Sequence, residues 1–359
     1  MLGLQSDDRA VAIGERSLEL LPGATVIVPA FNEALNIADT LRSLKDQTRP
    51  PDEIIVVDDC SDDGTGDIAR ALDVTVVRPP RNTGSKAAAQ TFALDHVNTS
   101  QTITVDADTI LAPDALEKIL SPFSDPEVAA ACGFVVPRHV RSVWERGRYI
   151  EYLVAFTFFK PIQNYYGKPL ISSGCFSAYR TSALLAAGGW SDRTLAEDMD
   201  LTWTLYESDW KVRFVPEAVC MPIEPASLTY LHRQLRRWSH GFVQNVRLHQ
   251  RKLPRIGFLR SMLAVAQWDA VIAPLVYLFV IPALSLFLTP WFLIGYVIDA
   301  PVVAIPVIVG AVRRHEKALA LCSLPAFFLL RIVNGLHMLQ AVWSEWIRGV
   351  ELDVYEKGH

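Results

Sequence analysis

The chain has 359 residues, of which 50% are hydrophobic and 20% charged, and its net charge of −5 argues against a general nucleic-acid binder. The mean hydropathy of +0.21 is high for a soluble protein, and the apolar surplus lies between residues 261 and 343. Five scattered cysteines without C-x-x-C spacing argue against a disulfide scaffold or a zinc site, and favour a reduced, cytosolic domain. Because Asp7, Asp8 and Arg9 interrupt the first ten residues, we expect neither a signal peptide nor a membrane helix before the soluble part.

The first hundred residues alternate β-branched runs with helical patterns. Continuous apolar strands alternating with helices are typical of a mostly parallel sheet covered on both faces, in which ligands bind beyond the carboxyl ends of the strands. Asp58, Asp59, Asp106 and Asp108 all fall at such ends. The predicted strands are 24–30, 53–58, 74–78 and 102–105, and the predicted helices are 34–46, a short one after Gly64, and 85–96.

Further along, the stretch 139–165 is rich in aromatic and basic side chains. It fits a helix lying in the membrane interface and, equally well, a helix packed on the sheet. Two more helices are predicted, from 195 to about 208 and over 227–250.

Three apolar segments near the C-terminal end are candidate membrane crossings. Residues 270–289 are uncharged, whereas 291–311 contains Asp299 and 318–343 contains Arg331. A basic loop at 313–317 separates the last two, and the positive-inside rule predicts that this loop and the α/β domain are cytoplasmic. Three crossings would leave the C-terminus outside. Two crossings with an interfacial helix remain the alternative.

Asp58 and Asp59 begin an acidic turn that runs to residue 65. Their carboxylates can accept hydrogen bonds from a uracil N–H and from ribose hydroxyls, although capping of the following helix would explain the same acids. A basic, glycine-containing loop at 81–86 opens the next helix. Its backbone N–H groups and Lys86 could bind a phosphate group, although this motif taken alone favours an ordinary loop between a strand and a helix.

Asp106 and Asp108 form an Asp-x-Asp motif at the end of an apolar strand. Divalent hard cations take oxygen ligands of this kind, and Mg²⁺ or Mn²⁺ typically bridges them to a diphosphate. Such a metal neutralises a leaving nucleotide diphosphate, so no protein acid is required. A single Asp-x-Asp is common by chance, but its position downstream of Asp58 and Asp59 makes it more specific.

Two further motifs complete the set. Glu197 and Asp198 open a predicted helix, where a carboxylate stays ionised and can act as the base that inverting sugar transfer needs; simple helix capping is the alternative. Gln234, Arg237 and Trp238 lie on one helical face at spacings of three and four residues. Arginine can clamp a diphosphate and a tryptophan ring can stack on a sugar, whereas a basic helix on anionic lipid would look similar.

In this order, and followed by apolar helices, the five motifs resemble the processive family 2 glycosyltransferases: hyaluronan, chitin, cellulose and poly-N-acetylglucosamine synthases. The resemblance covers residues 24–343, and the stretch from Ser173 to Arg180 is most similar to the hyaluronan and chito-oligosaccharide branch. It implies an α/β fold with a GT-A-type nucleotide-sugar-binding domain followed by C-terminal transmembrane α-helices. It also implies Mg²⁺ or Mn²⁺ as cofactor and a UDP-sugar as donor. Ala196 stands where threonine is usual before Glu-Asp.

The resemblance also assigns roles to individual residues. The proposed catalytic base is Asp198. The metal ligands are Asp106 and Asp108. The donor-binding residues are Pro29, Phe31, Glu33, Asp58, Asp59, Lys86, Asp106 and Arg237, and the acceptor- or diphosphate-binding residues are Ser173, Gly174, Glu197, Gln234, Arg237 and Trp238.

We therefore predict four regions: an N-terminal segment (1–23), a cytoplasmic glycosyltransferase domain (24–255), a transmembrane helical domain (256–347) and a tail (348–359). The predicted reaction is inverting, processive transfer of a hexose or N-acetylhexosamine from a UDP-sugar to a growing β-linked polysaccharide or a lipid-linked acceptor. The predicted protein is a multi-pass protein of the cell membrane in contact with membrane lipid and with no nucleic-acid partner. A homo-oligomer is left open.

Three alternatives compete with this prediction. Transfer of a single sugar to a polyprenyl phosphate would use the first three motifs and the membrane helices, but has no need of Gln-x-x-Arg-Trp. A nucleotidyltransferase that makes nucleotide sugars would be soluble, with a glycine-rich pyrophosphate loop near the N-terminus. A membrane channel or scaffold would need none of the five ordered motifs.

Overall fold

The computed structural model describes residues 20–252, 257–298 and 300–352. The chain divides into two compact units. Unit 1 contains the residues up to Val135 and Gly167–Ile223, and unit 2 contains Val136–Tyr166 and the residues from Glu224 onward. The predicted junction at 255 and 256 and most of the two predicted terminal segments lie outside the described residues. The predicted division into cytoplasmic and transmembrane domains stays a prediction.

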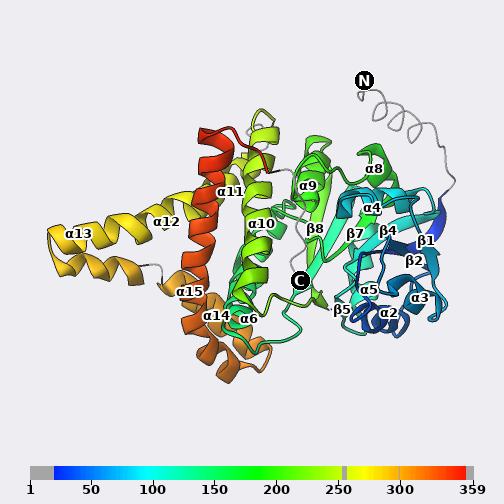
Figure 1. The fold of residues 1–359 in the computed structure, drawn as a ribbon, viewed down its shortest axis with the longest axis horizontal. Helices are drawn as coiled ribbons and strands as arrows, with labels where there is room; N and C mark the ends of the chain where they lie inside the picture. The colour runs from blue at the N-terminus through cyan, green and yellow to red at the C-terminus, as the bar shows by residue number, and fades with distance from the viewer. Residues whose placement is uncertain (1–19, 253–256, 299, 353–359) are drawn as a thin grey trace. The chain divides into compact units, whose positions relative to one another are not determined.

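Unit 1 is built on an eight-stranded sheet, drawn from blue to green in Figure 1. Its strands are β1 (Leu21–Ala30), β2 (Glu53–Asp58), β3 (Thr75–Val77), β4 (Thr99–Val105), β5 (Ile110–Leu111), β6 (Val128–Val135), β7 (Phe176–Arg180) and β8 (Lys211–Met221). They lie in the order β3-β2-β1-β4-β7-β6-β8-β5. The first four are parallel, β7 is antiparallel to both neighbours, β6 and β8 are parallel, and β5 is antiparallel to β8.

Helices cover both faces of this sheet (Figure 1). They are α2 (Ile37–Lys45), α3 (Thr65–Arg70), α4 (Lys86–Leu94), α5 (Ala115–Leu120), α8 (Thr181–Ala186) and α9 (Glu197–Glu207), with a 3-10 turn at Ser121–Ser124. The crossovers through α2 and α3 move along the sheet in one direction, and the crossover through α4 returns past β1. Because β-α-β crossovers are right-handed, α2 and α3 cover one face and α4 the other.

The local sequence explains these elements. Val26, Ile27 and Val28 of β1 are all fully buried, as expected for a strand with helices on both sides. Helix α2 buries Ile37 and Leu41, which are one helical turn apart, and leaves its other face to solvent. The predicted α/β architecture is therefore confirmed.

One edge of the sheet collects the predicted site residues. Strand β1 lies between β2 and β4, which follow crossovers of opposite direction, so the carboxyl ends of these strands form a topological switch point. Ala30 pairs with Asp58 across β1 and β2, and Val105 pairs with Phe176 at the start of β7. The residues that follow β1, β2 and β4 and those that precede β7 therefore lie at the same edge.

Unit 2 is helical. Its helices are α6 (Val143–Val154), α7 (Lys160–Tyr165), α10 (Leu228–His249), α11 (Gly257–Gln267), α12 (Ala273–Leu275), α13 (Ile281–Phe287), α14 (Ala300–Arg313) and α15 (Lys317–Val342). Among the described residues of this unit, four π-helical turns and one 3-10 helix continue or join these helices. The π-helical turns are at Ala155–Phe159, Trp268–Ile272, Val276–Val280 and Trp343–Ile347, and the 3-10 helix is at Pro290–Val297. A capping box between Ser142 and Glu145 begins α6. The aromatic and basic stretch thus forms a helix that packs against α14 and α15.

In the part of the chain that the structure describes, two helical runs are long and apolar enough to cross a membrane by length and composition, Pro290–Arg313 and Lys317–Ile347. They contain the second and third predicted crossings. The first predicted crossing, residues 270–289, contains the shorter apolar run Ala273–Phe287, which by itself is below the length of a bilayer crossing. On α15, apolar side chains at Leu321, Phe328, Ile332 and Leu336 are exposed along one face. The opposite face packs on α6 and α10.

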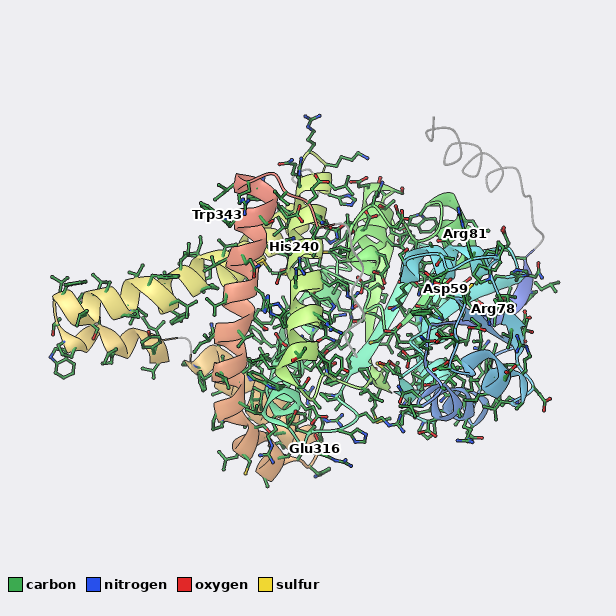
Figure 2. The ribbon with its side chains drawn as sticks, viewed as in Figure 1. Asp59, Arg78, Arg81, His240, Glu316 and Trp343 are labelled. Atoms are coloured by element: carbon green, nitrogen blue, oxygen red, sulfur yellow. The ribbon has the colours of Figure 1, made fainter. Side chains whose placement is uncertain are left out.

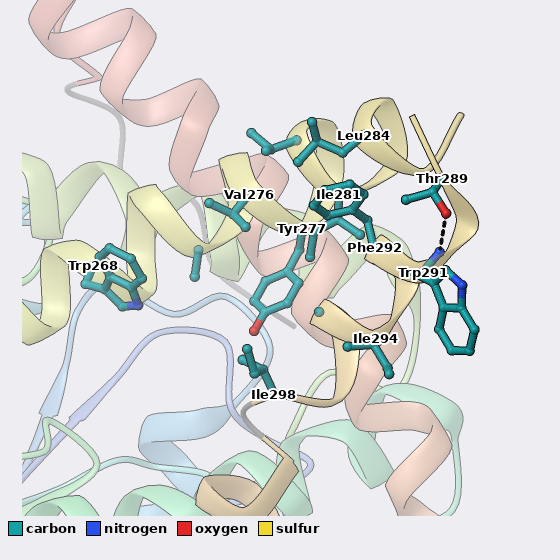
Figure 3. Close-up of a pocket in the computed structure, with 13 residues that line it drawn as sticks. Trp268, Val276, Tyr277, Ile281, Leu284, Thr289, Trp291, Phe292, Ile294 and Ile298 are labelled. Carbon is teal, nitrogen blue, oxygen red and sulfur yellow. Dashed lines mark hydrogen bonds between the residues drawn. The ribbon is translucent and has the colours of Figure 1, made fainter. Parts of the chain in front are cut away.

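An apolar cavity of about 490 Å³ lies between the helical run 273–287 and the 3-10 helix that returns along it (Figure 3). Its lining includes Trp268, Tyr277, Ile281 and Phe292. Among the described residues, none of those that line this cavity carries a carboxylate, an imidazole or an amine. The residues capable of acid–base or metal chemistry lie elsewhere in the described chain.

Candidate active site

The end of β2 is held by Asp58, whose side chain is fully buried. One of its oxygens accepts a hydrogen bond from the Ser61 N–H at 2.9 Å, and the other is paired with Arg78 at 2.8 Å (Figure 2 labels Arg78). Gly66 is required beside it, because an added Cβ would lie 2.4 Å from the same carboxylate. Both oxygens of Asp58 thus have partners within unit 1. The residue therefore orders the acidic turn that we predicted to bind the nucleoside.

Asp59, labelled in Figure 2, connects the acidic turn after β2 with the basic loop at 81–86 through hydrogen bonds. Its carboxylate accepts hydrogen bonds from the Thr83 N–H at 2.8 Å and from the Thr83 hydroxyl at 2.9 Å. The Asn82 side chain donates to the Asp59 carbonyl at 2.8 Å. The acidic turn and the basic loop at 81–86 are therefore one hydrogen-bonded structure at the sheet edge.

The segment after β1 is fastened to the same turn. Pro29 lies within β1, and Phe31 directly after it leaves 43% of its surface exposed, so its ring is accessible for stacking on a base. Glu33 is buried, and its N–H donates to the Thr65 hydroxyl at 2.8 Å. Asn32 has a left-handed backbone, and its N–H donates to the Ser61 hydroxyl at 3.0 Å.

The Asp-x-Asp motif follows β4 as predicted. The Asp106 N–H donates to the Cys175 carbonyl at 3.2 Å, and the Asp106 carboxylate forms an ion pair with Lys86. Asp108 is buried and accepts a hydrogen bond from the Thr109 hydroxyl at 3.2 Å. Among the described residues, no group of three or more His, Cys, Asp or Glu side chains could hold a metal by themselves.

This donor set still fits Mg²⁺ or Mn²⁺. Such cations are usually bound by one or two carboxylates, with the remaining ligands supplied by substrate phosphates and water. Asp106 and Asp108 supply two carboxylates at a strand end, and the amine of Lys86 already balances the charge of Asp106. The arrangement suits a cation that arrives together with a diphosphate.

Lys86 is the central cation of unit 1's acidic edge. Besides Asp106, its amine donates to the Gly174 carbonyl at 3.0 Å and lies 3.8 Å from the Glu197 carboxylate. Gly174 allows this approach, since an added Cβ would lie 3.3 Å from the amine and 2.9 Å from Asp198. The structure therefore brings together five predicted residues: Lys86, Asp106, Gly174, Glu197 and Asp198.

Asp198 is held by two backbone donors. The Gly174 N–H donates to its Oδ2 at 2.7 Å, and the Met199 N–H donates to its Oδ1 at 2.8 Å. The loop before β7 is tied to α9 at a second point, where the Ser172 N–H donates to the Thr202 hydroxyl at 2.9 Å. Because each carboxylate oxygen keeps a further lone pair, Asp198 is oriented and can still accept a proton.

The pKa of Asp198 is raised to about 6. Burial is the largest cause, and the neighbouring negative charge of Glu197 adds to it. Lys86 and the Gly174 N–H act in the opposite direction and limit the rise. A carboxylate with a pKa near 6 is ionised at neutral pH and is a stronger base than an ordinary aspartate, which suits removal of a proton from a hydroxyl group.

In unit 2, Gln234 and Trp238 lie on the same face of α10, as their spacing predicted. Both contact Arg148 of α6, at 2.9 Å to the Gln234 oxygen and 4.5 Å to the centre of the Trp238 ring. Arg237 is partly exposed on the same helix, as is Trp238. Sequence reasoning missed Arg148, whose only signal was its place in a basic, aromatic stretch.

Comparison with known proteins agrees with these motifs. Residues 25–186 match glycosyl transferase family 2. The chain is 28% identical over 224 residues to a poly-beta-1,6-N-acetyl-D-glucosamine synthase of Staphylococcus epidermidis, covering 61% of this chain and 54% of the relative. It is also 28% identical over 230 residues to the Staphylococcus aureus enzyme of strain COL, covering 63% and 56%. The chain thus aligns with little more than half the length of these relatives.

A similar fold occurs in a solved structure, the mannosyltransferase PcManGT from Pyrobaculum calidifontis in complex with GDP-Man and Mn²⁺. The TM-score is 0.61 at 22% identity, over 95% of this chain and 93% of that one, a likeness that shows the fold alone. Poly-N-acetylglucosamine synthases are one of the four kinds of enzyme that the motifs resembled. The finer expectation of the hyaluronan and chito-oligosaccharide branch stays a prediction. Residues 25–186 therefore match glycosyl transferase family 2, and the chain has the GT-A-type fold that its motifs predicted.

Proposed function

We propose that this protein is a membrane-bound, inverting and processive glycosyltransferase. It transfers a hexose or N-acetylhexosamine from a UDP-sugar to a growing β-linked polysaccharide. The matched relatives are poly-beta-1,6-N-acetyl-D-glucosamine synthases, so UDP-N-acetylglucosamine is the first donor to test.

The donor binds at the carboxyl edge of β1, β2 and β4. Phe31 offers an exposed ring to the base, and Asp59 with the loop that it orders lies at the nucleoside side. Asp106 and Asp108 would hold Mg²⁺ or Mn²⁺ against the diphosphate. The metal, when bound, supplies positive charge that stabilises the departing diphosphate. Lys86 adds a second positive charge at the same place.

The chemical step uses Asp198 as general base. The acceptor hydroxyl gives its proton to the Asp198 carboxylate, its oxygen bonds to the anomeric carbon, and the bond from that carbon to the diphosphate breaks with UDP as leaving group. Gly174 and Met199 orient the carboxylate through their N–H groups. A single base opposite the leaving group leads to inversion.

The acceptor end of the polymer is assigned to Gln234, Arg237 and Trp238, together with Ser173, Gly174 and Glu197. The support is chemical: arginine suits a diphosphate and a partly exposed indole ring suits a sugar face.

The membrane orientation follows from charge and connectivity. The basic loop 313–317 is proposed to be cytoplasmic. Within unit 2, the Tyr149 hydroxyl of α6 donates to Glu316 of this loop at 2.8 Å (Figure 2 labels Glu316). Helix α6 lies in the chain between β6 and β7, so this contact ties the loop to a helix whose two ends continue into strands of the sheet. Contact with membrane lipid and a multi-pass topology belong to the same proposal.

The observation that carries the proposal is the hydrogen-bonded arrangement of Asp198, Gly174, Lys86 and Asp106 inside a family 2 domain. The test is product analysis after incubating the membrane-reconstituted protein with individual radiolabelled UDP-sugars. Incorporation of many sugars per chain supports it. One sugar on each polyprenyl phosphate would identify a single-sugar transferase instead, and no transfer from any UDP-sugar would refute the proposal.

A further inference from the structure

Arg148 is a fully buried cation at the centre of unit 2. Only 1% of its surface is exposed, although it lies on α6 among partly apolar helices. Its guanidinium is ion-paired with Glu151 and lies 3.6 Å from Glu224. Burying a charge of this kind is costly unless several polar groups surround it, and a hydrophobic side chain of similar size often packs as well. Its presence therefore needs an explanation beyond stability.

The same guanidinium contacts two residues of the Gln-x-x-Arg-Trp motif. One of its terminal nitrogens donates to the Gln234 oxygen at 2.9 Å. Its central carbon lies 4.5 Å from the centre of the Trp238 ring, a cation–π contact. Gln234 also hydrogen-bonds to Glu224, so its amide has a partner on each side and a defined orientation.

The contact with Trp238 has a geometric consequence. A planar guanidinium over the ring occupies one face of the indole and limits rotation about the side-chain bonds. A sugar ring that stacks on Trp238 must therefore use the opposite face. Arg148 thus selects the face that Trp238 presents.

The surrounding acids keep Arg148 charged and in place. Asn334 of α15 donates to Glu151 at 2.8 Å, and the Tyr152 hydroxyl donates to Glu224 at 2.6 Å. Burial lowers the pKa of Arg148, but Glu151 and Glu224 more than compensate and hold the pKa above its usual range. The cluster, which we call the Arg148 cluster, comprises Arg148, Glu151, Glu224, Gln234 and Trp238. It joins α6, α10 and the segment before α10.

We propose that Arg148 is a positioning residue that sets the orientation of Trp238 and Gln234 for the acceptor sugar. This inference rests on the proposed function, because it assigns the acceptor end to these two residues. Arg148 acts through these two residues and has no proposed part in donor or metal binding. Its loss should impair chain extension while the donor is still bound and slowly hydrolysed by water.

The test uses the full-length protein in lipid nanodiscs with radiolabelled UDP-N-acetylglucosamine. Arg148→Met alone would leave the buried Glu224 carboxylate without its cation, so the main variant is Arg148→Met with Glu224→Gln, which removes these two buried charges. Glu151, the other acidic partner, is partly exposed and keeps its hydrogen bond from Asn334. Arg148→Lys is the conservative variant, and Arg146→Met on the same helix is the matched control. The readouts are product length at equal donor turnover, UDP affinity, and the rate of donor hydrolysis.

We expect extension by the double variant to fall about tenfold, the size expected for a buried cation–π contact and a hydrogen bond to a charged group, with UDP affinity within about twofold of wild type. Arg148→Lys should lie in between, and Arg146→Met should match wild type. Adding Trp238→Ala to the double variant should have no further effect, since both changes remove one interaction. The proposal would be overturned if the double variant extended the chain at the wild-type rate. It would also be overturned if the loss of extension in the triple variant equalled the product of the losses caused by the double variant and by Trp238→Ala.

A structural readout separates this inference from the proposed function. If wild-type protein transfers no sugar, the proposed function fails, but the orientation of Trp238 can still be measured. A cryo-EM structure of the Arg148→Met, Glu224→Gln variant should show the indole ring displaced from its wild-type position. An unchanged ring would overturn the positioning role whatever the activity.

Discussion

Replacing the base, Asp198→Asn, tests the mechanism most directly. The substitution keeps the size of the side chain but removes its charge and one acceptor oxygen. In the wild-type protein, the Asp198 carboxylate accepts hydrogen bonds from the Gly174 N–H at 2.7 Å and from the Met199 N–H at 2.8 Å. Whichever way the new amide is turned, its NH₂ group faces one of these donors. Losing one such hydrogen bond costs about 1–3 kcal/mol of folding free energy.

An opposing effect limits that loss of stability. Burial and the charge of Glu197 raise the pKa of Asp198 to about 6. At neutral pH the ionised carboxylate therefore lowers the stability of the folded protein. Removing the charge relieves this cost. We therefore expect a small net change in stability and intact donor binding.

Turnover should fall far more, by roughly 10²–10⁴, the usual contribution of a positioned base. That range corresponds to about 3–5 kcal/mol in the activation free energy. The assay combines the affinity for UDP-N-acetylglucosamine from calorimetry with the single-turnover rate of sugar transfer. Asp200→Asn is the matched control, because Asp200 is two residues along the same helix and paired with Arg193 at 2.7 Å. It should lower the thermal midpoint without a comparable loss of turnover. Parallel loss of donor affinity and turnover in Asp198→Asn would show that Asp198 is structural.

The remaining predictions concern pH, metal, topology and processivity. Because Asp198 must be ionised, kcat/KM should rise with pH and level off above about 6, as the raised pKa implies; a profile that levels off near 4 would contradict that assignment. Chelation with EDTA should abolish transfer, Mg²⁺ or Mn²⁺ should restore it, and Asp108→Asn should weaken metal-dependent donor binding; full activity in EDTA would exclude the metal. In intact cells, a membrane-impermeant thiol reagent should label Tyr355→Cys but not His315→Cys, and the reverse labelling would invert the proposed orientation. Trp238→Ala should shorten the polymer about tenfold at equal donor turnover while sparing donor hydrolysis, and unchanged product sizes would remove the stacking role.

The sequence by itself determined the strands and the ends at which the acids lie. The β-branched runs at 24–30 and 53–58 are buried strands, and the Asp-x-Asp motif directly follows β4, because strand formation and turn chemistry depend on neighbouring residues. The helical spacing also placed Gln234 and Trp238 on one face of α10, since a helix has a regular period.

Only the tertiary structure decided which of these residues meet. Asp198 receives its oriented hydrogen bond from Gly174, 24 residues away, and Lys86 reaches the Gly174 carbonyl across 88 residues. Arg148 and Gln234 are 86 residues apart, and in the sequence Arg148 is one of several basic residues in its stretch. Contacts of this kind depend on strand order and helix packing, which bring distant segments together through the burial of apolar surface and leave no periodic pattern in the local sequence.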